Sequence, residues 1–139
     1  MIPWQAARSV SRWDSAKSAK GRDRWQTIAR EASKQSMRPW MPEVQPLVTT
    51  TQLAARVADS TVLVLDPSSD HPLTSVTAHD FGHRDVLVVV GPEGGIAPEE
   101  LLALTTAGAR PVRLGSSVLR TSTAGPAAIA VLSVTLGRW

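Results

Sequence analysis

The chain has 139 residues, of which 42% are hydrophobic and 19% charged, a composition typical of one globular domain. It contains no cysteine, which excludes a disulfide framework, a thiolate metal site and a cysteine nucleophile. The apolar runs are far shorter than a membrane span and no signal-peptide pattern follows Met1, so we expect a cytoplasmic protein without a membrane partner.

The net charge of +3 is unevenly distributed along the chain. Residues 1–40 hold nine Lys/Arg against three Asp/Glu, whereas residues 41–139 hold six against nine. A basic first third suggests a polyanionic partner, most plausibly nucleic acid. A solvated helix face is the other interpretation, and charge alone favours it.

Residues 1–21 predict the end of a strand followed by a loop. A helix is predicted over 22–37, because apolar residues recur at i, i+3, i+4 and i+7 (Trp25, Ile28, Ala29, Ala32). This pattern places Trp25 in the core. The two prolines at 39 and 42 end the helix. A shorter helix is expected over 53–58, with Thr50 or Thr51 as its N-cap.

The hydrophobic period then changes from helical to strand-like. Residues 61–65 and 86–90 are continuous β-branched runs, as in buried parallel strands, and 111–114 is a third short strand. A helix begins at Pro98 and ends before Gly108. A last helix over 123–136 is apolar nearly all round, so we expect it to be buried or to cover a partner. The alternation predicts an α/β fold with a mostly parallel sheet flanked by helices, in one domain spanning 1–139.

Two glycine-containing loops leave the carboxyl ends of predicted strands, where open α/β sheets bind ligands. They are GPEGG (91–95) and GSSVLRT (115–121). Bare backbone can hydrogen-bond an adenine edge and ribose hydroxyls. Neither loop has a phosphate-binding motif, so a nucleoside with little negative charge fits better than a nucleoside triphosphate. Structural turns are the alternative interpretation of each loop taken alone.

Other residues that could bind ligands have weaker signals. The three histidines (His71, His79, His83) lack metal-ligand spacing, so we expect no metal site. The five tryptophans could stack on bases.

Together, "GPEGGIAPEE" and the following "LGSSVLRTSTAGPAA" resemble the SPOUT superfamily of RNA methyltransferases. The pair is most similar to the RsmE family, which methylates N3 of a uridine in 16S, small-subunit ribosomal RNA. The upstream segments "IPWQAARSVSRW" and "RWQTIAREASKQSMRPWMPEV" are similar to the same family, so the resemblance covers essentially the whole chain.

The resemblance implies a C-terminal trefoil knot, S-adenosyl-L-methionine as cofactor, 16S ribosomal RNA or the small ribosomal subunit as partner, and a homodimer joined partly by the last helix. Carried over by position, the cofactor-binding residues are Gly91, Pro92, Glu93, Gly94 and Gly95 on one wall and Leu114, Gly115, Val118, Leu119, Arg120 and Thr121 on the other. As a hypothesis on catalysis, Arg120 or Arg38 stabilises a developing uracil anion, and Glu93 orients the base or accepts a proton.

The chain departs from the family at several positions. Ser116 and Ser117 stand where a Pro-Arg pair is frequent, and Ser122 stands where Glu is common. Ala97 stands where Ser or Thr would cap a helix, a loss of about 1 kcal/mol. Family members also carry an N-terminal β-barrel and a first strand and helix, so the resemblance begins near the second strand and implies a truncated domain. A catalytically inactive RNA- or nucleoside-binding remnant is the alternative function, and a dimeric structural domain is a third.

Overall fold

A three-stranded parallel sheet forms the centre of the molecule in the computed structural model, which describes residues 1–139 apart from the side chains of residues 15 and 16. The strands are β1 (Ser60–Leu65), β2 (Asp85–Val90) and β3 (Arg110–Val112), in the order β2-β1-β3. Because Leu65 pairs with both Val90 and Val112, all three strands end at the same edge.

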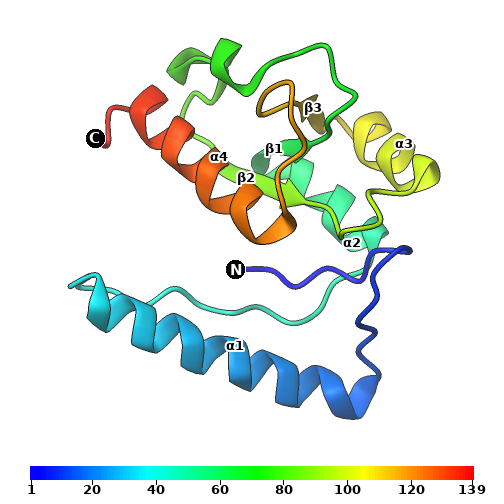
Figure 1. The fold of residues 1–139 in the computed structure, drawn as a ribbon, viewed down its shortest axis with the longest axis vertical. Helices are drawn as coiled ribbons and strands as arrows, with labels where there is room; N and C mark the ends of the chain where they lie inside the picture. Colours follow the sequence, from blue (N-terminus) through cyan, green and yellow to red (C-terminus); the bar gives the residue numbers. More distant parts are fainter.

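Helices and loops cover both faces of this sheet (Figure 1). On one face, α4 (Thr121–Thr135) and the 73–81 segment pack over Leu63. On the other face, α2 (Thr50–Ala54) and α3 (Pro98–Thr106) pack over Val62 and Val64. Each fully buried side chain of this size contributes about 1.5–3 kcal/mol. The predicted parallel sheet flanked by helices is confirmed, while the trefoil threading stays a prediction.

Helix α1 (Ser15–Gln35) lies apart from the sheet, joined to it by extended segments (Figure 1). It begins seven residues before the predicted start, so the loop expected up to residue 21 was wrong. Asp14 is the N-cap, and its carboxylate accepts from the Lys17 N–H at 2.8 Å. The first two turns are polar, which is why hydrophobic spacing did not reveal them.

The inward face of α1 is bound mainly through polar side chains. Arg22 Nε donates to the Val44 carbonyl at 2.8 Å, and the Gln26 amide pairs with the backbone of residues 42 and 44. Ala29 is buried beside them, whereas Trp25 is 38% and Ile28 57% exposed. The prediction of Trp25 in the core was therefore wrong, because hydrogen bonds rather than the apolar stripe select the face that packs.

The start of the chain is extended and runs parallel to residues 45–48. The Val48 N–H donates to the Pro3 carbonyl at 2.9 Å, and the Gln5 N–H donates to the Val48 carbonyl at 3.0 Å. This pairing agrees with the strand end expected there. It also places the loop after Trp4 next to α3.

Several helix boundaries differ slightly from the sequence prediction. The N-cap of α2 is Thr49, not Thr50 or Thr51, because the Gln52 side chain closes a reciprocal capping box with it. Gly108 follows α3 at φ 106°, as predicted. Short 3₁₀ turns occupy Ala55–Ala58, Leu73–Ser75 and Ala78–Asp80. Within the described residues no helix is long and apolar enough to cross a membrane.

Candidate functional site

A cavity of about 640 Å³ opens at the edge where the three strands end. Its volume lies within the range of about 300–1,000 Å³ that is typical of small-molecule sites. The lining comes from three segments that follow β1, β2 and β3, namely 65–67, 90–96 and 112–124, together with Leu101 of α3. Most of these side chains are apolar, and the charged ones are Asp66, Glu93 and Arg120.

The first wall is the loop after β2, which folds as a tight turn. The Gly95 N–H donates to the Pro92 carbonyl at 2.8 Å, and Gly95 has φ 74°. A side chain at Gly91 would place its Cβ 2.6 Å from Ile96 Cγ1. Glycine at residue 91 therefore allows Ile96 to pack against the loop and line the cavity.

The second wall is the loop after β3, which leads directly into α4. Arg120 is the N-cap of α4, and its carbonyl accepts from the N–H groups of Thr123 and Ala124 at 2.8 and 2.9 Å. Thr121 Oγ1 donates to the Gly91 carbonyl at 3.4 Å, which joins the two walls. The positive end of the α4 dipole thus faces the cavity.

The third wall, at the end of β1, was missed by sequence reasoning. Leu65, Asp66 and Pro67 line the cavity, and the Asp66 N–H donates to the Val112 carbonyl at 2.9 Å. Ser68 donates to the Asp66 carboxylate from both its N–H and its hydroxyl. The rule that ligands bind beyond carboxyl strand ends could have identified Asp66, which follows the predicted strand at 61–65 directly.

Ten of the eleven residues expected to bind a cofactor line this cavity (Gly91, Pro92, Glu93, Gly95, Leu114, Gly115, Val118, Leu119, Arg120, Thr121). The exception is Gly94, which faces Arg8: the guanidinium donates to the Gly94 carbonyl at 3.2 Å. Arg38 does not line the cavity either, and its guanidinium lies 5.3 Å from the centre of the Trp40 ring. The structure therefore brings Glu93 and Arg120 together at one cavity and leaves Arg38 outside it.

Glu100, which is buried on the first turn of α3, holds the surrounding segments together. Its Oε1 accepts from the Ala7 N–H at 3.0 Å and from the Thr50 hydroxyl at 2.8 Å. Its Oε2 accepts from the Ala97 N–H at 3.4 Å, and Trp4 Nε1 donates to Thr50 Oγ1 at 3.2 Å. One carboxylate thus connects the N-terminal loop, α2 and the end of the glycine loop.

The same carboxylate partly replaces the capping hydroxyl that Ala97 lacks. Ala97 is the N-cap of α3 and makes no side-chain hydrogen bond. Glu100 at N3 still accepts the Ala97 N–H, so half of the capping box remains. Among the side chains that the structure describes, no group of three or more His, Asp or Glu could hold a metal ion.

Residues 1–133 match the family described as RNA methyltransferase domain. The chain belongs to this family. It is 45% identical over 99% of its length to ribosomal RNA small subunit methyltransferase E of Mycobacterium tuberculosis, and 36% identical over 95% to the Bacillus subtilis protein of the same name. The chain spans about half the length of these relatives, 54% in both cases. Hence the resemblance read from the two glycine loops is confirmed.

Solved structures agree with this RNA methyltransferase family. A putative methyltransferase from Legionella pneumophila in complex with bound S-adenosylmethionine superposes with a TM-score of 0.82 at 32% identity, covering 96% of this chain and 54% of that one. Ribosomal RNA small subunit methyltransferase E from Neisseria gonorrhoeae, bound to S-adenosyl methionine, superposes with a TM-score of 0.78 at 29% identity. The match covers 96% of this chain and 53% of that one. These structural neighbours support S-adenosylmethionine as the cofactor of the family fold.

Proposed function

We propose that this chain is the catalytic part of an S-adenosylmethionine-dependent enzyme that methylates N3 of a uridine in 16S ribosomal RNA. The observation that carries the proposal is the single cavity in which the loops after β2 and β3 face each other. Relatives named ribosomal RNA small subunit methyltransferase E, and neighbours with bound S-adenosylmethionine, support it. Ribosomal RNA as substrate is consistent with a cytoplasmic location.

The residues at the cavity fit this cofactor. Apolar side chains and bare glycine backbone suit an adenine ring, and the Asp66 carboxylate can accept hydrogen bonds from ribose hydroxyls. The N-terminus of α4, beginning at Thr121, suits the carboxylate of the methionine moiety. When bound, S-adenosylmethionine supplies an electrophilic methyl group on a sulfonium.

Two charged side chains on the cavity lining are suited to act on the uracil. Uracil N3 carries a proton and is a weak nucleophile until that proton leaves. Glu93 can orient the base or accept this proton, and Arg120 can stabilise the negative charge that develops on the ring. The geometry favours Arg120 over Arg38 for this role, because Arg38 lies outside the cavity.

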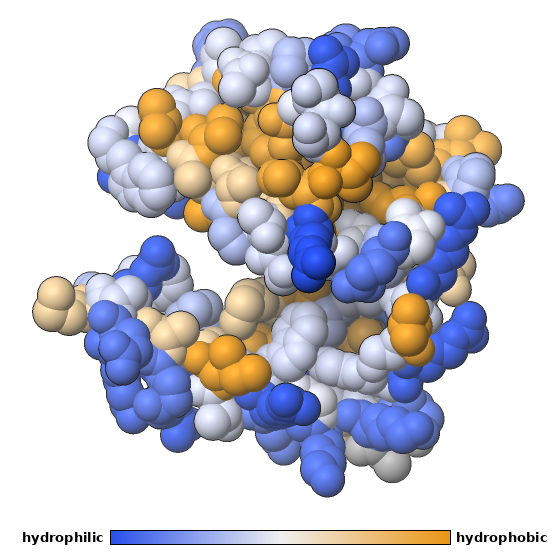
Figure 2. Space-filling view, in the orientation of Figure 1, coloured by the Kyte–Doolittle hydropathy of each residue, from blue (hydrophilic) through white to orange (hydrophobic). Residues whose placement is uncertain are grey.

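We also propose that the chain forms a homodimer through α4. This helix leaves Ile129 58% and Val134 64% exposed, and hydrophobic surface gathers over it (Figure 2). Burial of these side chains against a second copy would remove apolar area from water. Sedimentation of wild type and Ile129→Glu tests the assignment: a dimer that the charge disrupts supports it, and a monomeric wild type refutes it.

Calorimetric titration with S-adenosylmethionine, followed by transfer of a labelled methyl group to small-subunit RNA, tests the catalytic proposal. We expect binding by the wild type, and a loss of methyl transfer of about 10²–10⁴-fold in Glu93→Gln and in Arg120→Ala, measured at saturating S-adenosylmethionine because both residues also line the cofactor cavity. Arg38→Ala should retain activity. Absence of cofactor binding would refute the proposal, whereas binding without transfer by the wild type would favour the inactive nucleoside-binding remnant.

A further inference from the structure

A second cavity, of about 520 Å³, lies on the other side of the turn that forms the first wall. Pro92 and Glu93 line both cavities. The remaining lining comes from residues 3–13, from the side of α1 that carries Trp25 and Ile28, and from Leu47. A molecule in this second cavity would therefore be separated from the cofactor cavity by only one turn of backbone.

Aromatic rings form part of the lining of the second cavity. Three of the five tryptophans of the chain line it (Trp4, Trp13, Trp25). The rings of Trp13 and Trp25 meet edge to face, with centroids 5.5 Å apart and planes at 76°. Trp25 remains 38% exposed, so part of its ring is available to a ligand.

The ring of Trp13 is held against the backbone of α1 by a glycine. A Cβ on Gly21 would lie 2.7 Å from the Trp13 ring, so any other residue at position 21 would displace the ring. Glycine is unfavourable inside a helix, and its presence here is explained by this contact. The Trp13 backbone N–H also donates to Gln5 Oε1 at 3.1 Å, which holds the backbone that carries the ring. These contacts fix the ring before any ligand arrives.

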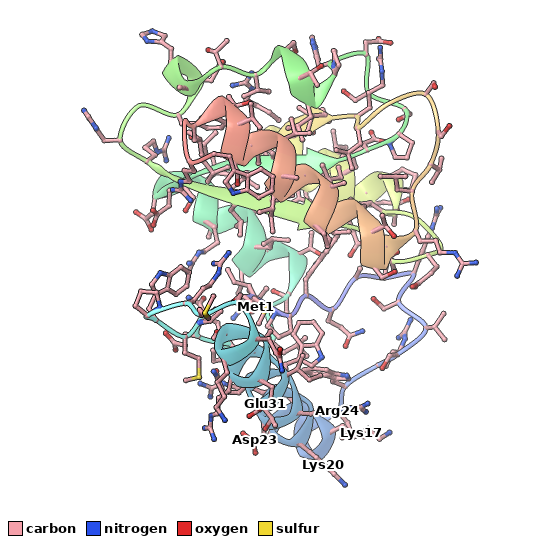
Figure 3. All side chains as sticks on the ribbon, turned by 60° about the vertical axis from the view of Figure 1, so that its left-hand side comes forward. Met1, Lys17, Lys20, Asp23, Arg24 and Glu31 are labelled. Atoms are coloured by element: carbon pink, nitrogen blue, oxygen red, sulfur yellow. The ribbon has the colours of Figure 1, made fainter. Side chains whose placement is uncertain are left out.

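A stripe of cations on α1 leads to the same cavity. Lys17, Lys20 and Arg24 recur at i, i+3 and i+7, and Figure 3 shows them projecting from one side of the helix. Arg24 lines the cavity itself. Lys17 forms an exposed ion pair with Asp14 at 3.3 Å, whereas Lys20 and Arg24 have no acidic partner among the side chains that the structure describes.

We propose that this second cavity, which we call the tryptophan pocket, binds an unpaired pyrimidine nucleotide of the RNA substrate. The base stacks on Trp25 beside Trp13, and Lys20 and Arg24 contact the flanking phosphates. Stacking on an aromatic ring combined with nearby cations is the usual way in which single-stranded nucleic acid is held. The proposal rests on the proposed function, since Pro92 and Glu93 line both cavities and a nucleotide held in the tryptophan pocket would keep the substrate strand next to the cofactor cavity.

Tryptophan fluorescence measures this binding directly. A uridine-containing hexaribonucleotide is titrated into the wild-type chain, with an otherwise identical oligonucleotide that lacks the uracil base as the reference probe. We expect quenching by the first and weaker binding of the second. Trp25→Ala should lower the affinity about 5- to 140-fold, the range contributed by one base–aromatic stack. Trp40→Ala and Trp139→Ala, which remove tryptophans outside the pocket, are matched controls and should bind as the wild type does.

Gly21→Ala provides a second test that leaves the aromatic ring in the sequence. Alanine favours the helix but displaces the Trp13 ring, so we expect weaker oligonucleotide binding with a thermal midpoint that does not explain the loss. Arg24→Gln should weaken binding and reduce its salt dependence. Failure of both variants to alter affinity overturns the proposal.

The outcomes also separate this proposal from the proposed function. Equal affinities in Trp25→Ala and Trp40→Ala, with normal S-adenosylmethionine binding, would refute the tryptophan pocket and leave the proposed function standing. Specific oligonucleotide binding without any cofactor binding would support the tryptophan pocket and refute the proposed function. If Trp25→Ala changes the sedimentation of the chain and not its RNA affinity, the pocket is a protein contact and the proposal fails.

Discussion

Glu100→Gln is a sharp test of how the glycine loop is held in place. The buried carboxylate accepts from Ala7, Thr50 and Ala97, and α3 presents a second glutamate, Glu99, one residue earlier. Glu99 is exposed and accepts no hydrogen bond of this kind from the residues that the structure describes. The two substitutions remove the same charge from the same helix turn, so their difference isolates the hydrogen-bond network.

The expected magnitude follows from the hydrogen bonds that change. In Glu100→Gln the amide oxygen can still accept from Ala7 and Thr50, but as neutral bonds that contribute about 0.5–1.5 kcal/mol instead of about 1.5–3. The amide nitrogen then meets the Ala97 N–H, and that bond is lost. We expect the free energy of unfolding to fall by about 2–4 kcal/mol. Glu99→Gln loses only the helix-dipole term of about 0.3–1 kcal/mol.

Urea unfolding of wild type, Glu99→Gln and Glu100→Gln measures these values directly. A double-mutant cycle that combines Glu100→Gln with Thr50→Val should give a coupling energy between the two residues of about 0.5–3 kcal/mol, because Thr50 links Trp4 to Glu100. If Glu99→Gln and Glu100→Gln shift the urea midpoint equally, the carboxylate is not an anchor and the network contributes nothing to stability.

Four further substitutions test other parts of the structure. Gly91→Ala should lower the free energy of unfolding by about 1–3 kcal/mol, because the added Cβ would overlap Ile96. The added Cβ of Gly115→Ala would meet no atom within 4 Å, so this variant should leave the thermal midpoint unchanged. Equal shifts of the thermal midpoint in the two variants would contradict the packing of residue 91. Hydrogen bonds from the backbone and side chain of Thr77, then from Arg110, lower the pKa of Asp80 from 3.8 to about 2. This carboxylate therefore stabilises the fold above pH 4, and the stability difference from Asp80→Asn should vanish as the pH falls through 2, as urea midpoints across that range will show. Gln26→Ala should lower the free energy of unfolding by about 1–3 kcal/mol in chemical denaturation, through the loss of two hydrogen bonds to residues 42–44, and a neutral result would refute that role.

The sheet and its ligand edge could be predicted from the sequence for a clear physical reason. Strands covered on both faces leave continuous β-branched runs such as 61–65 and 86–90, and parallel strands bring their following loops to one edge. The structure brings ten of the eleven residues expected to bind the cofactor, all but Gly94, to one cavity at this edge, and their role in cofactor binding stays a prediction.

The position of α1 could not be predicted in the same way. Hydrophobic spacing selected Trp25 and Ile28 as the buried stripe, but the face that packs uses Arg22 and Gln26, which hydrogen-bond the backbone of a distant segment. Polar contacts of this kind leave no periodic signal. The role of Glu100 was hidden for a similar reason, since a glutamate in a first helix turn is usually explained by the helix dipole alone.

The parallel pairing of β1 has a consequence for how the chain folds. Ser60 pairs with Asp85 and Leu63 with Arg110, so neither edge of the central strand can be satisfied by a hairpin. Long loops must close before either partner docks, and contacts of such sequence separation slow the search for the native state. Refolding should accordingly be governed by the arrival of residues 110–112, with β1 acquiring protection from hydrogen exchange late.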